Sequence, residues 1–247
     1  MQQWGMDYDL YTVTTSDDWE LSLYRLTGFN GSEVDPDKTP ILIVHGAAMD
    51  ASSFIFGQSV DPVTFELDTD VAPVSFQLLE LGYDVWMANN RVSQYSNVNR
   101  NYPDADDPSA ANFAADFKAK YDVDWTDMGT KDLPAFIDKV LEVSGKDKLS
   151  YIGYSTGTTQ LTYALSTVTT DYFTSRIERA IYQAACVFME PLGMDYYTST
   201  FVPARERGVY YWYGQDTSAT MVERACPEDE GITPENDAAC AFYAEAH

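Results

Sequence analysis

The stretch LSYIGYSTGTTQLTYAL, residues 149–165, contains the pattern that decides the fold. Its opening residues predict a strand over Leu149–Gly153, and its closing residues predict a helix over Thr156–Val168. Between them lies the pentapeptide Gly153-Tyr154-Ser155-Thr156-Gly157, which has the form G-x-S-x-G. A strand that passes through a tight turn into a helix is the repeating unit of α/β folds.

The two glycines of this pentapeptide have a steric reason. A serine on so tight a turn has a strained backbone, and side chains two residues before and after it would collide with the neighbouring strand and helix. Glycine at both positions lets the hydroxyl of Ser155 project from the carboxyl edge of the sheet, as a nucleophile in acyl transfer must. The alternative is a turn in which Ser155 only caps the helix. The strand–turn–helix context favours the nucleophile.

Outward from this point, strands and helices alternate along the chain. This order predicts an α/β fold with a mostly parallel central sheet flanked by helices and connected by right-handed crossovers. Residues 89–122 are polar and irregular and predict no regular element. The other predicted strands are Leu10–Thr14, Trp19–Leu26, Pro40–Val44, Tyr83–Met87 and Ala180–Phe188, and the other predicted helices are Val71–Leu81 and a segment that starts at Asp132 and stops at Gly145.

Acyl transfer also needs N–H donors that face the developing oxyanion. The backbone N–H of Thr156 follows the serine and lies at the positive end of a helix, so it is the first candidate. The second is the N–H of Ala47, in the loop after the strand Pro40–Val44, where Gly46 permits a close approach. His45 precedes the serine, whereas the expected order is serine, acid, histidine, so His45 is interpreted as a loop-shaping residue.

The composition limits the classes of partner. The 247 residues include 39 Asp and Glu against 15 Lys and Arg, a formal net charge of −24, and 45% are hydrophobic. The length fits one large α/β domain or two small ones, and the apolar content argues against global disorder. The negative charge argues against nucleic acid and against electrostatic docking to anionic lipid, but not against a neutral lipid interface.

The cysteines and the N-terminal region bear on the compartment. Cys186 lies in an apolar stretch and is expected to be a buried free thiol. Cys226 and Cys240 could close a disulfide, which needs an oxidising compartment, or remain two reduced thiols. Asn30-Gly31-Ser32 is a glycosylation sequon. The first twenty residues contain no signal peptide as given, and no run approaches the roughly 18 apolar residues of a membrane span.

Several motifs together resemble the acid lipases, the family of gastric lipase and lysosomal acid lipase. The similarity covers most of residues 4–191. The elbow usually reads G-H-S-Q-G in that family, whereas Tyr154 and Thr156 stand at the variable positions here. The motifs, in chain order, are Trp4-Gly5, Tyr11–Thr15, Leu42–Gly46, Leu81–Arg91, Trp125–Gly129, Asp132–Asp138 and Ser155–Thr159.

This resemblance implies an α/β-hydrolase fold that needs no metal or cofactor and hydrolyses lipid esters, such as triacylglycerols or sterol esters, at a lipid–water interface. It implies a secreted protein or one in an acidic, lysosome-like compartment. Residues 1–190 are then expected to form the N-terminal part of the hydrolase core, and residues 191–247 the beginning of a helical cap.

In the family the acid and histidine of the triad follow the cap, and only 92 residues follow Ser155 here (247 − 155 = 92). The resemblance therefore implies that both partners lie on a missing segment or a second chain. The alternative is a capless triad in which Asp216, after a strand at Val209–Tyr213, pairs with His247. A terminal histidine is poorly held, which argues against it.

Two functions remain open on the sequence. The first is a serine ester hydrolase of the acid-lipase type, with Ser155 as nucleophile and the N–H groups of Ala47 and Thr156 as oxyanion donors. The second is a catalytically inactive, lipase-like protein that serves as a scaffold, a lipid-binding module or a subunit of an assembly.

Overall fold

The structure is a computed structural model that describes residues 6–29, 33–47, 49–55, 59–60, 67–68, 73–167 and 170–187. The chain divides into two compact units. The first comprises residues 1–100 and 124–186 and contains the sheet and Ser155. The second includes residues 101–123, and each unit is described by itself.

Seven strands of the described part form one mixed sheet, in which β1, β2, β6, β3, β8 and β9 follow one another across the sheet and β7 pairs with β2. The strands β6, β3, β8 and β9 run parallel, whereas β1 and β2 form an antiparallel hairpin whose second strand pairs with β6. The strands are β1 (Met6–Thr14), β2 (Trp19–Phe29), β3 (Ile41–Val44), β6 (Val85–Ala88), β7 (Val98–Asn99), β8 (Leu149–Tyr154) and β9 (Ile177–Gln183), and β4 (Ser59–Val60) pairs with β5 (Leu67–Asp68) in a separate ribbon.

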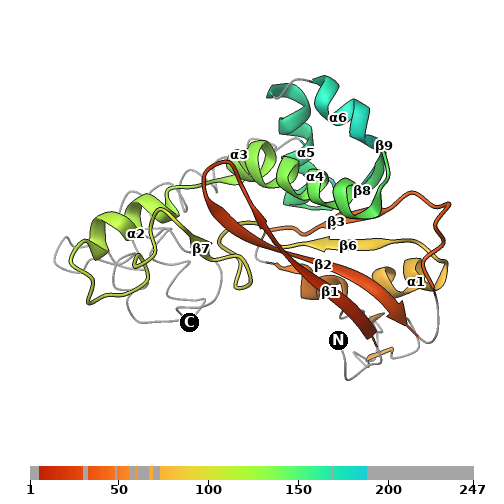
Figure 1. Cartoon of the computed structure of the whole chain (residues 1–247), viewed down its shortest axis with the longest axis horizontal. Coiled ribbons are helices and arrows are strands. Elements are labelled where there is room, and N and C mark those ends of the chain that lie inside the picture. Colours follow the sequence, from red (N-terminus) through yellow and green to blue (C-terminus); the bar gives the residue numbers. More distant parts are fainter. Residues whose placement is uncertain are drawn as a thin grey trace. The chain divides into compact units, whose positions relative to one another are not determined.

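Helices cover both faces of the sheet (Figure 1). On one face α4 packs against β1 and β8, and α5 packs against β8. On the other face α1 contacts β2 and β6, and the short helix η2 contacts β6. The helices of this unit are η2 (Ala51–Phe54), α1 (Val74–Glu80), α3 (Trp125–Asp127), the π-helical turn η3 (Met128–Asp132), α4 (Leu133–Ser144), α5 (Thr156–Thr167) and α6 (Thr170–Arg176).

Local chemistry explains where these elements lie. All four residues of β3 and all four of β6 are buried, as expected for central strands with helices on both faces. The helix α4 has Pro134 in its first turn, where the missing N–H is no loss, and it ends at Gly145 in the left-handed conformation, with φ of 69°. Its buried face consists of Leu133, Phe136, Ile137 and Val140.

The predicted α/β fold with parallel strands and flanking helices is confirmed, with corrections at some elements. The strand predicted over Ala180–Phe188 is wrong in its bounds, because β9 begins at Ile177 and ends at Gln183. The strand lies at the end of the strand order and is largely exposed, so Glu178 and Arg179 are accommodated within it. It ends where Ala184 takes a left-handed backbone with φ of 47°.

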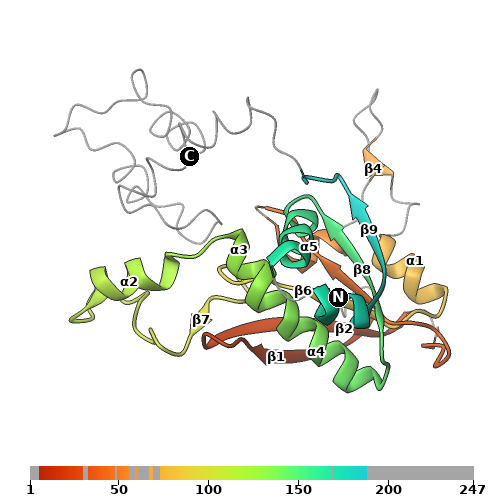
Figure 2. The same ribbon diagram turned by 90° about the horizontal axis from the view of Figure 1, so that it is seen from above.

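Four helical segments were not predicted, the first of which is the short helix η2 after β3. In the first unit α6 precedes β9, and α3 with η3 precedes α4, so that the helical path begins before Asp132. In the second unit the segment predicted to be irregular contains α2 (Phe113–Tyr121), of which only Lys120 and Tyr121 are buried. A helix with so small a buried face leaves little hydrophobic periodicity in the sequence. Figure 2 shows α3 and α4 of the first unit following one another along the sheet.

Candidate active site

Ser155 occupies the single-residue turn between β8 and α5, as the sequence predicts. Its backbone is left-handed, with φ of 49°. Its N–H donates to the carbonyl oxygen of Gln183 at 2.9 Å, and its carbonyl oxygen accepts from the N–H of Thr158 at 2.8 Å. A non-glycine residue at such a φ persists only where its surroundings hold it there. The serine is therefore held by both of its backbone polar groups.

The steric reason predicted for the two glycines is confirmed by their surroundings. A β-carbon added to Gly157 would lie 2.6 Å from the carbonyl oxygen of Val44, on the neighbouring strand β3. One added to Gly153 would lie 2.8 Å from the ring of Tyr151 and 2.9 Å from the backbone of Gly157, at the start of α5. Only glycine fits either position without displacing backbone atoms.

The loop after β3 passes directly beside the serine. A β-carbon added to Gly46 would lie 2.8 Å from the β-carbon of Ser155 and 3.1 Å from the ring of Tyr154. Ala47 is the next residue and is exposed, while Ala48 lies outside the described residues. Thr156 is the first residue of α5, so its N–H belongs to the helix's first N–H groups, which have no intrahelical acceptor. The structure thus places the segment that contains Ala47, and Thr156 itself, next to Ser155.

His45 is buried and uses both ring nitrogens within the protein. Its Nδ1 lies 2.8 Å from the carbonyl oxygen of Gly46, to which it can only donate, and its Nε2 accepts from the N–H of Asn90 at 3.1 Å. These two bonds define a neutral ring protonated on Nδ1. Burial lowers the pKa of His45, in agreement with that neutral form. This geometry fits the interpretation of His45 as a loop-shaping residue, and it leaves no ring nitrogen for Ser155.

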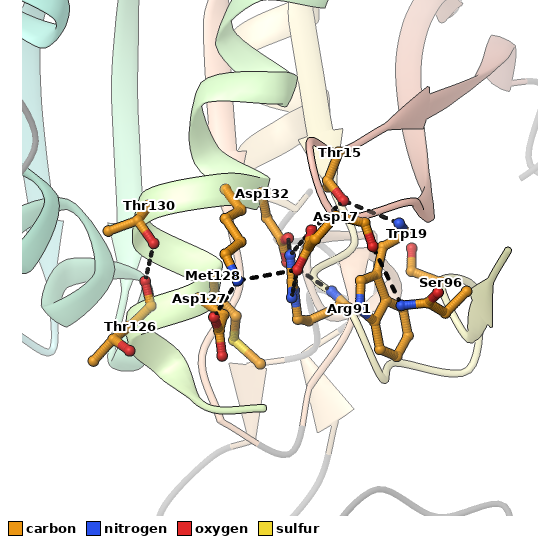
Figure 3. Close-up of polar contacts among 12 residues, drawn as sticks. Thr15, Asp17, Trp19, Arg91, Ser96, Thr126, Asp127, Met128, Thr130 and Asp132 are labelled. Atoms are coloured by element: carbon orange, nitrogen blue, oxygen red, sulfur yellow. Dashed lines mark hydrogen bonds and ion pairs between the residues drawn. The ribbon is translucent and has the colours of Figure 1, made fainter. Parts of the chain in front are cut away.

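The loop after β6 is fixed by a buried ion pair (Figure 3). Arg91 is fully buried, and its guanidinium donates to Asp132 at 2.6 and 2.8 Å and to Asp17 at 2.8 and 3.0 Å. The backbone N–H of Arg91 donates to Asp132 at 3.0 Å. Burial favours the neutral form of each group. Burial raises the pKa of Asp132 by more than the positive charge of Arg91 lowers it. The two carboxylates outweigh burial at Arg91 and raise its pKa.

This ion pair ties three segments of the chain together. Asp17 lies in the turn between β1 and β2, and burial is outweighed there by hydrogen bonds from Arg91 and Thr15, which lower the pKa of Asp17 well below its ordinary value. Asp132 ends the π-helical turn η3. Gly129 lets this turn pack on α5, because an added β-carbon would lie 2.7 Å from the carbonyl oxygen of Gln160. The guanidinium therefore links the hairpin, the loop after β6 and the helix layer beside the serine.

Strained backbone concentrates at the carboxyl ends of the parallel strands. Four non-glycine residues of the described part have positive φ, and Asp18 is the one that lies in the hairpin turn. Ser155 and Ala184 follow β8 and β9 directly, and Val92 lies in the loop after β6. Backbone strain of this kind is concentrated in functional sites, so this edge of the sheet is the candidate active site.

Several predicted residues lie outside the described residues. They are Asp216 and His247 of the alternative triad, Cys226 and Cys240, the sequon Asn30–Ser32, and the cap segment 191–247. Cys186 is a free thiol as predicted, but it is partly exposed rather than buried. The ranges given above contain no group of three His, Cys, Asp or Glu residues that could hold a metal ion. No helix among the described residues is long and apolar enough to span a bilayer.

Several polar residues that hold the serine turn and the loop after β6 were not predicted from the sequence. Thr158, which is fully buried, and Thr159 contact the segment that follows β9, and Asp17 reaches Arg91 from the hairpin. The only local signal is the pair of threonines directly after Gly157, at the start of a helix. Their partners lie 27 and 28 residues away, and such pairings leave no pattern in the sequence.

Comparison with known proteins places these features in context. A family described as "alpha/beta hydrolase fold" matches residues 39–224, and one described as "Partial alpha/beta-hydrolase lipase region" matches residues 1–58. Lipase lipl-1 of Caenorhabditis elegans is 33% identical over 168 residues, which are 67% of this chain and 36% of that protein. Gastric triacylglycerol lipase of Rattus norvegicus is 32% identical over 166 residues, which are 66% of this chain and 36% of that protein.

Among solved structures, an alpha/beta hydrolase from Novosphingobium aromaticivorans matches with a TM-score of 0.46 and 16% identity, over 81% of this chain and 49% of that one. The chain spans about a third of the length of the two curated relatives, whose matched share is 36%.

Proposed function

Because the chain belongs to the α/β-hydrolase fold family and, within it, to the acid lipases, we propose that it forms the nucleophile-bearing part of a serine ester hydrolase that acts on lipid esters. The single observation that supports this most strongly is the conformation of Ser155. It has a φ of 49° between β8 and α5, and Gly46, in the loop after β3, lies against its β-carbon. A residue that only caps a helix needs neither the left-handed backbone nor that close approach.

In the proposed reaction the Oγ of Ser155 attacks the ester carbonyl carbon, and its proton passes to a histidine base. The carbonyl oxygen becomes an oxyanion, which accepts hydrogen bonds from the N–H groups of Thr156 and Ala47. The positive end of α5 adds to this stabilisation. Collapse of the tetrahedral intermediate expels the alcohol, which takes the proton, and water then releases the acid by the same route.

The histidine and its acid partner are proposed to lie on a segment beyond the described residues or on a second chain. His45 does not fill the role, since Gly46 and Asn90 engage both of its nitrogens. We assign residues 1–190 to the hydrolase core and 191–247 to the start of a cap, as the resemblance to acid lipases implies.

The proposed substrates are uncharged lipid esters of the triacylglycerol or sterol ester type. The relatives named as lipases, one of them a gastric triacylglycerol lipase, support this class. The net charge of −24 is compatible with a neutral lipid interface and unfavourable for an anionic one. On the basis of the same relationship to lipases, we also propose a secreted or lysosome-like acidic location.

A fluorophosphonate probe tests this function, because it phosphonylates a serine only when the hydroxyl is activated. The intact protein is treated with the probe and digested, and the modified peptide is identified by mass spectrometry, with Ser155→Ala as the matched control. We expect modification of Ser155 and none in the control. If Ser155 stays unmodified under conditions that label a reference esterase, the inactive, lipase-like alternative holds for this chain.

The substrate class needs a separate measurement. Release of fatty acid from emulsified trioctanoin and tributyrin, compared with a soluble acetate ester, distinguishes a lipase from a small-ester esterase. We expect the emulsified esters to be hydrolysed faster. Preference for the soluble acetate would leave the serine hydrolase in place and remove the lipid substrate.

A further inference from the structure

The hydroxyl of Thr158 lies between the serine turn and the segment that follows β9. It donates to the carbonyl oxygen of Ser155 at 2.6 Å and accepts from the backbone N–H of Cys186 at 2.8 Å. Thr158 is fully buried, with 0% of its surface exposed. A carbonyl oxygen can only accept and a backbone N–H can only donate, so the hydroxyl hydrogen points at the carbonyl oxygen of Ser155.

Two other threonines on α5 also donate to a carbonyl oxygen one turn back, and the hydroxyl of Thr162 lies 3.1 Å from that of Tyr182 as well. Thr162 donates to the carbonyl oxygen of Thr158 at 2.8 Å, and Thr167 donates to that of Tyr163 at 2.8 Å. Such bonds to a carbonyl one turn back are common for threonine in helices. What distinguishes Thr158 is the second bond, from a backbone group 28 residues further along the chain.

The segment that provides this second bond is itself fixed to the same turn. The hydroxyl of Thr159 donates to the carbonyl oxygen of Cys186 at 2.6 Å, and the N–H of Ser155 donates to the carbonyl oxygen of Gln183 at 2.9 Å. Both backbone polar groups of Cys186 are thus bonded to the first turn of α5. The N–H of Cys186 that bonds to Thr158 is therefore held in a fixed position relative to Ser155.

The carbonyl that Thr158 holds belongs to the peptide unit that joins Ser155 to Thr156. A peptide unit is planar, so its C=O and its N–H point in opposite directions along one rigid plane. Fixing the carbonyl of Ser155 therefore fixes the direction of the N–H of Thr156. A hydrogen bond to the carbonyl oxygen also polarises the amide and strengthens its N–H as a donor.

We propose that Thr158 is a positioning residue that aims the N–H of Thr156 at the oxyanion, an inference that rests on the function proposed above. The hydroxyl does not touch the substrate. It acts through the shared peptide plane of Ser155 and Thr156, and the N–H of Cys186 holds the hydroxyl itself.

The test compares Thr158→Val, which keeps the shape and removes the hydroxyl, with Thr158→Ser, which keeps the hydroxyl. Thr162→Val is the matched control, since it removes a hydroxyl–carbonyl bond within the same helix and a contact with the hydroxyl of Tyr182, but no contact with Ser155 or Cys186. Ser155 keeps the N–H of Thr158 as a partner in every variant, so the turn itself is expected to survive. Folding is checked by near-ultraviolet circular dichroism.

The first readout is the rate of fluorophosphonate modification at Ser155, separated into the reversible constant and the maximal rate constant. Loss of a whole oxyanion donor lowers such rates about 100-fold or more, and we expect misalignment in Thr158→Val to lower the maximal rate constant about 10-fold. We expect the reversible constant to stay within about twofold, because the oxyanion forms only after binding. Thr158→Ser and Thr162→Val are expected to stay near the original rate.

The second readout does not depend on reactivity. In protein labelled with 15N-threonine, the amide signal of Thr156 is expected to shift in Thr158→Val and to return in Thr158→Ser. If Ser155 of the unaltered chain is not modified at all, the proposed function fails, and this signal alone decides the inference about Thr158.

An unchanged rate in Thr158→Val, or equal losses in Thr158→Val and Thr162→Val, would overturn the proposal. If Thr158→Val does not fold, Thr158→Ala and Thr158→Ser replace it as a pair that differs only in the hydroxyl. If Thr158→Ser alone folds, the hydroxyl serves the fold as a whole, and the positioning role is rejected.

Discussion

Ser155 and Ala184 are the first residues after two neighbouring parallel strands, and both have a left-handed backbone, with φ of 49° and 47°. The residues before them, Tyr154 and Gln183, are partners in the register of β8 and β9. A β-carbon in this conformation costs roughly 1–2 kcal/mol. The strained residue after β8 has a hydroxyl that can act as a nucleophile, whereas the strained residue after β9 has only a methyl group, which is unreactive.

Ala184→Gly is therefore expected to raise the free energy of unfolding by about 1 kcal/mol, since glycine adopts a positive φ without the steric cost. Urea unfolding followed by circular dichroism measures the change. Ala135→Gly, within α4, is the opposite control, because glycine inside a helix lowers stability by about 1 kcal/mol. Equal destabilisation by both substitutions would show that the backbone at Ala184 is not strained.

Two glycines separate steric exclusion from backbone strain. Gly145 has φ of 69° and open space around an added β-carbon, so Gly145→Ala is expected to cost about 1 kcal/mol, from backbone strain alone. Gly157→Ala would place a β-carbon 2.6 Å from the carbonyl oxygen of Val44, so we expect a loss of more than about 3 kcal/mol and of fluorophosphonate modification. Similar losses in the two variants would contradict the close packing of α5 on β3.

The central part of the fold can be predicted because its elements are self-contained in the sequence. The strands β3 and β6 are continuous apolar runs, and α4 has a proline at its start and a glycine at its end. The helix α2 and the start of β9 bury too few side chains to leave such a pattern. Local sequence thus predicts the central strands and α4, and it misses α2 and the first residues of β9.

The candidate site divides in the same way. The glycines around Ser155 are predictable, because a collision within one tight turn follows from local geometry. The contact between Thr158 and Cys186 is not, because a threonine hydroxyl can find a partner almost anywhere along the chain. The left-handed Ala184 also leaves no signal, since its residue type contradicts its conformation.

The buried ion pair of Arg91 and Asp132 predicts a large effect of a small change. Asp132→Asn keeps the shape and removes the charge, which leaves the buried guanidinium with only Asp17 as a carboxylate partner. We expect a loss of about 3 kcal/mol in the free energy of unfolding. The control is Glu142→Gln, which breaks an exposed ion pair with Lys139 within α4. It should change the free energy of unfolding by less than about 0.5 kcal/mol.

Asp17 makes stability depend on pH in a defined direction. Its pKa in the folded protein lies below the ordinary value of 3.8, so the folded state releases this proton more readily than the unfolded state. Its contribution is therefore complete above pH 3.8 and is lost as the pH falls below that value. The difference in unfolding free energy between the unaltered chain and Asp17→Asn should stay constant from about pH 7 to pH 5 and shrink below about pH 4. A difference that grows on acidification would contradict the assignment.

We propose that His45 supports the loop after β3 and is not the base, and the pH dependence of Ser155 modification distinguishes these two roles. In His45→Gln the amide oxygen can still accept from the N–H of Asn90, while the bond to the carbonyl of Gly46 is lost. We expect the rate of fluorophosphonate modification of Ser155 to fall about 10-fold through misplacement of the loop, with the midpoint of its pH profile unchanged. A base would behave differently, because its removal lowers the rate by roughly 10,000-fold or more and abolishes the ionisation in the profile. Loss of the pH dependence in His45→Gln would therefore show that His45 is the base. A pH–rate profile that is lowered but has the same midpoint would show that the ionising base is another residue.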